Sequence, residues 1–203
     1  MIMNGTRQTA LSLVGAFIAL GHVSNADAEQ EGHESDLLGN TRQLTFEGKR
    51  AGEGYFSADG SKLIFQSERE PDNPFYQIYL MDLETGDTER LSTGVGKTTC
   101  AWVHPDNSKI MFASTHLDPE ASAKQAEEFA EREKGTRRYS WSFDDQYDIF
   151  ERPIDGSGEL INLTKTLGYD AEGSYSPNGQ EILFASNRHA YSGELTADEQ
   201  AHL

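Results

Sequence analysis

Two glutamates and a cysteine recur at matching positions in this 203-residue sequence and could form a binding surface. Cys100 follows Glu53 by 47 residues, and Glu172 follows Cys100 by 72. The same intervals separate other matching segments, which predicts that the three residues occupy one position of a structural repeat, with Asp170 nearby. Carboxylates attract cations and protonated amines. Glu53, Cys100, Asp170 and Glu172 could therefore line a channel and bind a cation or the amino end of a peptide, although solvated channel residues, which we favour, would give the same pattern.

Two histidines and a group of aromatic residues supply weaker candidates. His116 and His189 each follow a predicted second strand of the repeat, so they could meet at one rim, although solvated loop histidines would give the same pattern. Trp141 lies in a segment rich in aromatic residues, 139–147. Such rings could stack on a glycan.

Motifs for catalysis or cofactor binding are incomplete. The segment Gly94–Thr98 is similar to the end of a phosphate-binding loop, but Leu91 stands where that loop has its first glycine. His33 and Glu34 are not followed by a histidine at position 37, as a zinc-binding helix would require. The sequence also has no G-x-S-x-G motif. We expect this chain to have no catalytic centre, cofactor or metal site.

Internal repetition is the main structural signal. A segment with an Asp or Asn turn before an apolar triplet appears three times, and a Leu-Ser or Leu-Thr signature appears three times at the same two offsets. The turn segments are 56–65, 103–112 and 175–184, and the signatures end at Thr45, Ser92 and Thr164. Two landmarks that share their spacing favour a repeated unit over an unrelated β-sandwich.

Each repeat predicts four short antiparallel strands. Asp-Gly, Asp-Asn and Asn-Gly pairs favour a tight turn between the first and second strands. The second strand, as in Leu63-Ile64-Phe65, is apolar on consecutive residues, which is typical of a strand covered on both faces. Such a unit buries its faces by radial stacking on copies of itself. The predicted fold class is all-β, a partial β-propeller of about two and a half four-stranded antiparallel blades with short helical insertions.

The predicted domain boundaries follow the repeats. Blade one covers 53–92, blade two covers 101–164 and a partial blade three covers 173–203, within an incomplete propeller over 41–203. Blade two contains a helical insertion, 117–140, with Asp118 as cap, Pro119 in the first turn and Gly135 at the end. Its thin apolar stripe predicts a helix lying over a neighbouring blade.

The two ends of the propeller carry further expectations. Thr196 and Glu199 form a capping-box pattern that predicts a second helix in an insertion after residue 184. The segment Arg42–Phe46 matches the fourth strands and would close a complete ring. Since a closed propeller needs about four to eight blades, we expect the chain to be a fragment that exposes an unpaired blade face.

The first 28 residues have the pattern of a signal peptide. Arg7 precedes the apolar run Ala10–Leu20, and Ala26-Asp27-Ala28 has small residues where signal peptidase cleaves. The run is too short for a membrane anchor, which needs roughly 18 or more apolar residues. We expect cleavage after Ala28, an acidic tail over 29–40, no stable membrane insertion afterwards, and a periplasmic or secreted location.

Charge and cysteine content limit the partners and the means of stabilisation. The formal net charge is −17, which disfavours binding to nucleic acid and to anionic lipid. Cys100 is the only cysteine, so no disulfide can form within the chain. The fold must therefore be stabilised by packing.

The segment Tyr175–Arg188 resembles the repeat of TolB-like propellers, which are related in pattern to WD-repeat blades but lack the WD dipeptide. The strand Ile78–Leu83 and its Thr85-Gly86 turn are similar too, and the resemblance covers 41–188. It implies a six-bladed periplasmic propeller that contacts other proteins. The α/β domain that usually precedes those blades has no room between Ala28 and Thr41.

Two functions are consistent with these observations. The first is a non-catalytic exported propeller that binds an unidentified protein or peptide. The alternative is an accessory propeller of an exported hydrolase, either a zinc aminopeptidase or a prolyl-oligopeptidase-like enzyme, whose catalytic domain lies beyond this sequence. A metal-ligand or serine-elbow domain encoded downstream would favour the second.

Overall fold

A computed structural model describes residue 33 and residues 37–135, 143–193 and 195–200. The chain divides into two units, 1–43 and 44–203, and all the described strands belong to the second. The predicted signal peptide and most of the predicted acidic tail lie outside the described residues. None of the described helices is long and apolar enough to cross a membrane.

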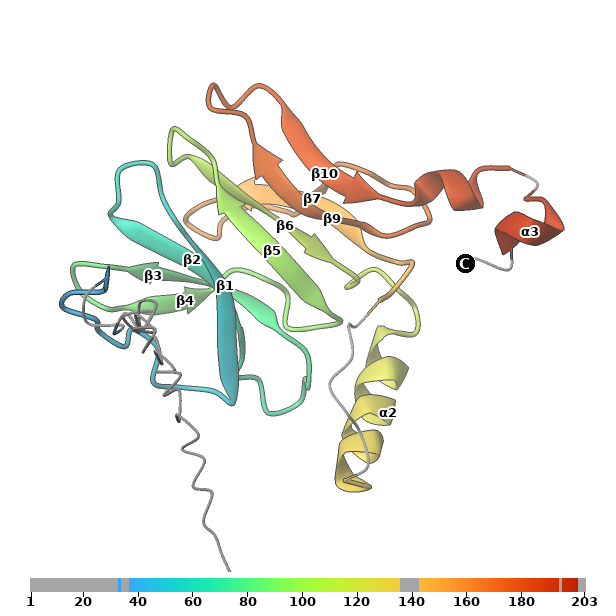
Figure 1. The fold of residues 1–203 in the computed structure, drawn as a ribbon, viewed down its shortest axis with the longest axis horizontal. Coiled ribbons are helices and arrows are strands. Elements are labelled where there is room, and N and C mark those ends of the chain that lie inside the picture. Colours follow the sequence, from blue (N-terminus) through green and yellow to red (C-terminus); the bar gives the residue numbers. More distant parts are fainter. Residues whose placement is uncertain (1–32, 34–36, 136–142, 194, 201–203) are drawn as a thin grey trace, which may run out of the picture. The chain divides into compact units, whose positions relative to one another are not determined.

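Blade one is an antiparallel sheet of four strands connected in sequence order (Figure 1). The turn between its first two strands is closed by the hydroxyl of Ser57, which donates to Asp59 at 2.7 Å and accepts the backbone N–H of Lys62 at 2.9 Å. Gly60 has φ of 71°, a left-handed conformation that glycine adopts without steric strain. The strands are β1 (Arg50–Phe56), β2 (Lys62–Glu68), β3 (Gln77–Asp82) and β4 (Thr88–Arg90).

Blade two repeats this topology and adds a helix, α2 (Ala121–Glu133), between its second and third strands. The helix begins two residues later than the predicted first helical position at Pro119, and Glu120 occupies the cap without a side-chain hydrogen bond. Asp118 instead accepts the N–H of Glu120 at 2.8 Å in the preceding turn. The strands are β5 (Thr98–Val103), β6 (Lys109–Ser114), β7 (Asp148–Pro153) and β8 (Ile161–Asn162).

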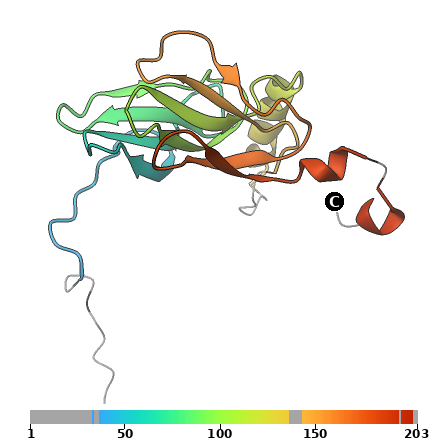
Figure 2. The same cartoon turned by 90° about the horizontal axis from the view of Figure 1, so that it is seen from above.

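The third repeat contributes a two-stranded antiparallel sheet, β9 (Asp170–Tyr175) and β10 (Ile182–Ser186). A 3₁₀ helix, η1 (Arg188–Tyr191), and the short helix α3 (Ala197–Gln200) follow and lie beyond the end of β10 (Figures 1 and 2). The predicted partial blade followed by a helical excursion is therefore confirmed. The capping box forms as well, because Thr196 and Glu199 bond each other's backbone N–H groups at 2.8 and 3.3 Å.

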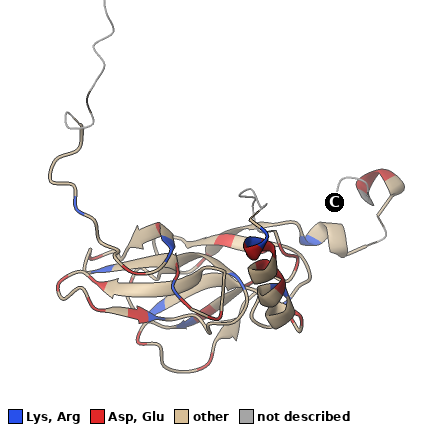
Figure 3. Cartoon of the chain, turned by 90° about the horizontal axis from the view of Figure 1, so that it is seen from below, with Lys and Arg blue, Asp and Glu red and all other residues tan. Residues whose placement is uncertain are grey.

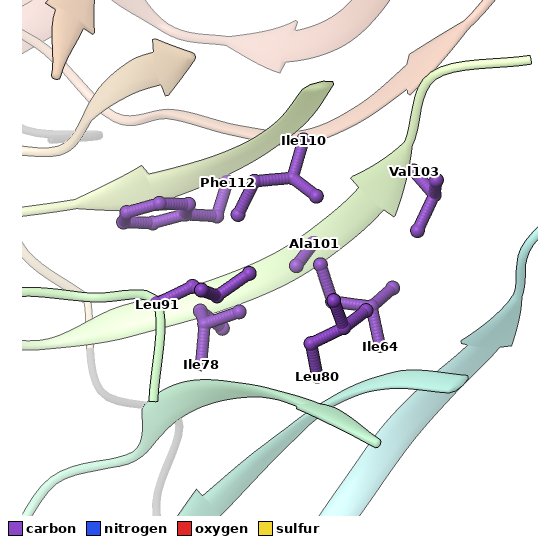
Figure 4. Close-up of a cluster of buried hydrophobic side chains, with 8 residues drawn as sticks. All are labelled: Ile64, Ile78, Leu80, Leu91, Ala101, Val103, Ile110 and Phe112. Carbon is purple, nitrogen blue, oxygen red and sulfur yellow. The ribbon is translucent and has the colours of Figure 1, made fainter. Parts of the chain in front are cut away.

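Apolar side chains fill the space between the first two blades (Figure 4). Each is at most 9% exposed, and burying one such aliphatic side chain contributes roughly 1.5–3 kcal/mol. The innermost strand β5 packs on blade one, and β9 packs in the same way on blade two. This repeated packing of one blade face on the next confirms the partial propeller. The cluster contains Ile64, Ile78, Leu80, Leu91, Ala101, Val103, Ile110 and Phe112.

The two ends of the described propeller have no further blade packed against them. Residues Arg42–Phe46 belong to no described strand, and the blade that they would join in a complete ring is not among the described sheets, so their pairing stays a prediction. The triplet Ile182-Leu183-Phe184 is not covered on both faces, and Leu183 is 77% exposed. The equivalent triplets in β2 and β6 are buried because a full blade packs around them.

Candidate functional site

The predicted channel residues share an unusual backbone conformation. Glu53, Cys100 and Glu172 have φ values of 50°, 47° and 56°, although none is a glycine. Each lies at an irregularity in the register of an innermost strand, which is the position of a β-bulge. A left-handed residue with a side chain costs about 1–2 kcal/mol, so three such residues at one repeat position indicate a backbone imposed by the blade itself.

Side-chain contacts bring two of these residues together across the first two blades. The Cys100 Sγ atom lies 3.5 Å from Glu53 Oε2, and the hydroxyl of Tyr55 donates to the same oxygen at 3.2 Å. Glu172 accepts a 3.5 Å hydrogen bond from the hydroxyl of Tyr169. Both glutamates are exposed, whereas Cys100 is buried. The three bulges thus present two carboxylates to solvent around a buried thiol.

The thiol of Cys100 is kept neutral by its surroundings. Burial raises its pKa to about 11, and the negative charges of Glu53 and Glu172 act in the same direction, while the hydroxyl of Thr99 opposes them. Burial and Glu53 also raise the pKa of Tyr55. A neutral buried thiol is a poor nucleophile. The site can therefore attract positive charge through its carboxylates, but Cys100 is unsuited to covalent catalysis.

Among the side chains that the structure describes, no three His, Cys, Asp or Glu residues come close enough to hold a metal ion. A bound metal would need its ligands at about 2.0–2.6 Å. Hydrogen bonds to an ammonium or guanidinium group span a longer reach, because each N–H can point to a different acceptor.

Asp170 has a different role from its neighbours. Its side chain is fully buried and accepts hydrogen bonds from Ser186 Oγ at 2.5 Å and Arg188 Nη2 at 2.7 Å. These contacts tie β9 to the end of β10, so the structure places Asp170 inside the blade. The sequence signal that could have indicated these contacts is the Ser-x-Arg pattern at the end of the second strand. It is formed here by Ser186 and Arg188 and occurs also at Ser67 and Arg69.

The two candidate histidines occupy unlike positions. His116 stands at the repeat position of Arg69 and Arg188, with Nδ1 2.9 Å from Ser114 Oγ and its ring 4.3 Å from that of Phe150. Burial lowers its pKa, with Asp148 opposing. His189 is exposed in η1, one residue past the equivalent position. No hydrogen bond or ring contact within the described part of the chain joins the two histidines.

An aromatic group lies next to the third bulge. The ring of Tyr169 stacks on Phe143 at 5.7 Å and meets Tyr147 edge-on at 5.4 Å. Phe143 is 51% exposed, while Tyr147 is buried. Because Tyr169 also donates to Glu172, this group continues the surface formed by the carboxylates. Trp141, predicted to belong here, lies outside the described residues.

Comparison with solved structures identifies the fold. A protein provisionally identified as TolB from Agrobacterium tumefaciens superposes with a TM-score of 0.51 and 21% identity over 70% of this chain. The chain has the fold of a TolB-like propeller. It spans only 40% of that protein's length.

Weaker likenesses to this TolB-like chain include TolB from Acinetobacter baumannii, with 20% identity, a TM-score of 0.43 and coverage of 68% and 27% of the two chains. A prolyl endopeptidase structure reaches 11% identity and a TM-score of 0.40, with coverage of 68% and 19%. No family model matches the sequence, and no curated protein matches it.

The insertion of this TolB-like chain packs as its sequence predicted. Arg132 on α2 donates to Glu68 of blade one at 2.6 Å and to the backbone oxygen of Pro74 at 2.7 Å. Gln125, also on α2, donates to the backbone oxygen of Asp72 at 2.9 Å. A helix inserted in blade two therefore covers one end of blade one. Figure 3 shows acidic positions on α2, on α3 and in several loops.

The segment Gly94–Thr98 covers the end of the link from β4 to β5 and the first residue of β5, as expected of a link between blades. The Nζ atom of Lys97 lies 2.9 Å from Asp144 Oδ2 and 5.2 Å from the ring centre of Phe75. Asn73 donates to the backbone oxygens of Gly94 and Gly96 at 2.9 and 2.8 Å. The lysine and the loop thus join the two blades, which is a role that the sequence did not reveal.

Proposed function

We propose that this chain is a non-catalytic, exported TolB-like propeller module that binds a basic segment or the amino end of a protein or peptide. The observation that carries the proposal is the shared bulge position of Glu53, Cys100 and Glu172. It holds two exposed carboxylates on the innermost strands of the first and third repeats, with Cys100 at the same position of the second. Inner strands line the central channel of a propeller, where a peptide end can enter.

The electrostatics of the site favour a cationic ligand. The net charge of −17 attracts positively charged partners over a distance, and the local carboxylates give that attraction a place to act. Cys100 and Tyr55 stay neutral, so the charge of the site comes from Glu53 and Glu172. A protonated amine or a guanidinium group would accordingly be bound by the carboxylate oxygens of Glu53 and Glu172.

The exposed ring of Phe143 extends the proposed site toward the third bulge. It stacks on Tyr169, whose hydroxyl contacts Glu172. An aromatic face beside a carboxylate suits the side chain of Lys or Arg, because the ring face attracts the cation while its methylene groups cover apolar surface. We therefore propose that Phe143 contacts the peptide residue next to the one whose amine is bound.

Binding of a defined peptide tests the proposal. The probe is a fluorescein-labelled Lys-Arg-Gly-Lys peptide with a free amino terminus, titrated by anisotropy at low and physiological salt. Glu53→Gln with Glu172→Gln should weaken binding roughly three- to thirtyfold, as expected for removal of two partly exposed charge contacts. Glu84→Gln is the matched control, because Glu84 is also exposed but lies in the turn after β3.

Two outcomes would count against this function. One is equal affinity in the double variant and the Glu84→Gln control, which would mean that only the overall charge attracts the peptide. The other is failure of the unmodified chain to bind the peptide at low salt. Export is tested separately by expressing the chain in a bacterium and sequencing the amino terminus of the periplasmic product, which should begin at Glu29.

A further inference from the structure

His104 occupies a turn position that serine holds in the other two repeats. In blade one the hydroxyl of Ser57 closes the turn, and Ser176 does the same in the third repeat by donating to Asn178 at 2.7 Å and accepting the N–H of Glu181 at 3.0 Å. These serine bonds stay within their own turns. An imidazole is longer than a hydroxymethyl group and carries two nitrogen atoms, so His104 can reach beyond its own blade.

The imidazole of His104 connects the second blade to the third. Its Nδ1 atom lies 2.6 Å from Asp106 Oδ1 in the same turn, and its Nε2 atom lies 3.1 Å from the backbone oxygen of Gly179 in the next repeat. The ring is 9% exposed and meets Tyr175 edge-on at 4.8 Å. A side chain at Gly179 would collide with it, because a Cβ atom there would lie 2.2 Å from Nε2.

Both ring nitrogens of His104 thus face acceptors. Hydrogen bonds from Ser108, followed by the contact with His104, lower the pKa of Asp106 to about 2, so its carboxylate is ionised at neutral pH. The Gly179 carbonyl can only accept. A neutral imidazole has one N–H and would leave its other nitrogen facing an oxygen without a proton between them. The N–H of Asp106 also approaches Nδ1, but at the longer distance of 3.3 Å.

The charged groups around this ring are few among the described residues. Asp106 faces it from its own turn, and Tyr175 faces it from β9. The Tyr175 hydroxyl donates to Glu151 on β7 at 2.7 Å, and Glu151 pairs with Lys109 on β6 at 2.8 Å. Lys109 and Glu151 neutralise each other, so Asp106 supplies the charge that complements a protonated ring.

We propose that His104 is a proton-dependent latch between the second and third blades. Its imidazolium form donates to the Asp106 carboxylate and to the Gly179 carbonyl at the same time. Its neutral form can make only one of these bonds, so the turn at 176–181 opens more often once the ring has lost its proton. This inference is independent of the proposed peptide site.

Hydrogen exchange of the Gly179 amide tests the latch, because that N–H is bonded to the backbone oxygen of Ser176 at 2.8 Å within the turn. The quantity compared is the protection factor of this amide, measured by NMR between pH 5.5 and 8. A protection factor is the ratio of the intrinsic to the observed exchange rate, so it already accounts for the intrinsic pH dependence of exchange. Protection in the unmodified chain should fall roughly ten- to hundredfold across this range, as expected for loss of one charged hydrogen bond. His104→Ser, which restores the residue of the other repeats, should show low protection at both ends.

A direct observation of the ring completes the test. At every pH at which the Gly179 amide is protected, the ¹⁵N signals of His104 should show that both ring nitrogens are protonated. Asp106→Asn should reduce the protection of the Gly179 amide at low pH. The latch is ruled out if protection is constant with pH, or if His104→Ser retains the pH dependence of the unmodified chain. A neutral His104 with an intact, protected turn would also overturn it.

Discussion

The guanidinium of Arg132 and the carboxylate of Glu68 lie 2.6 Å apart and connect the inserted helix to blade one. Glu68 is buried, and Lys49 and Arg50 also pair with it at 3.3 and 2.9 Å. Three cations around one buried carboxylate offset the loss of hydration that burial causes. The insertion is thereby part of the packing between the blades.

Removing Arg132 should loosen this contact without unfolding the chain. We expect Arg132→Ala to lower the free energy of unfolding by about 1–3 kcal/mol, because Glu68 keeps two cationic partners and avoids complete isolation. Urea unfolding followed by circular dichroism provides the measurement. Lys134→Ala is the control, since Lys134 is mostly exposed and its ion-pair partner among the described residues is Glu131 of α2; an equal effect of both variants would contradict the assignment.

The same cluster predicts acid sensitivity. Burial alone would raise the pKa of Glu68, but the bonds and charges of Arg132 and Arg50 outweigh it and lower the pKa below the usual value of 4.5. A carboxyl whose folded pKa is depressed contributes stability that is present above its unfolded pKa and is lost as the pH falls through the folded value. Stability should therefore decline below pH 4.5, and Glu68→Gln should make this decline shallower. An unchanged acid profile in Glu68→Gln would refute the prediction.

Two glycines with the same backbone conformation should respond differently to substitution. Gly60 and Gly179 have φ of 71° and 70°, so alanine at either should cost about 1–2 kcal/mol through the backbone. An added Cβ meets nothing within 4 Å at Gly60 but meets His104 at Gly179. Gly179→Ala should therefore be the more destabilising in thermal unfolding, and His104→Ser should relieve the difference. Equal effects of the two glycine substitutions would show that the turn of Gly179 does not contact His104.

Cys100 should react slowly with thiol reagents. Its pKa of about 11 leaves little thiolate at pH 8, and burial limits access. We expect Ellman's reagent to modify the folded chain at least tenfold more slowly than the urea-unfolded chain. Glu53→Gln removes one of the charges that raise the pKa and should speed the reaction severalfold, whereas Glu84→Gln should not. Rapid modification of the folded chain would contradict the described contact.

The repeat in the sequence was sufficient to predict the blades because each landmark has a local cause. The signature serine Ser92 donates to Gln77 at 2.7 Å and accepts the N–H of Ile78 at 3.0 Å, and Thr164 makes the matching bonds to Asp148 and Ile149 in blade two. These bonds are the same in both four-stranded blades that the structure describes.

Contacts between blades were harder to predict, since they depend on how successive sheets stack in space. Neither the reach of His104 to Gly179 nor the burial of Asp170 against Arg188 has a counterpart in every repeat. The sequence did align Glu53, Cys100 and Glu172. The left-handed backbone that they share was not predicted, because bulges are usually signalled by glycine.

The most direct test of a shared binding surface is amide chemical-shift mapping by NMR during titration with the Lys-Arg-Gly-Lys peptide. The amides around all three bulges, 52–55, 99–102 and 171–174, should shift together and saturate with one affinity, and they should stay unchanged in the Glu53→Gln, Glu172→Gln double variant. Shifts confined to the outer strands or to α2, with the three bulges silent, would contradict the proposed site.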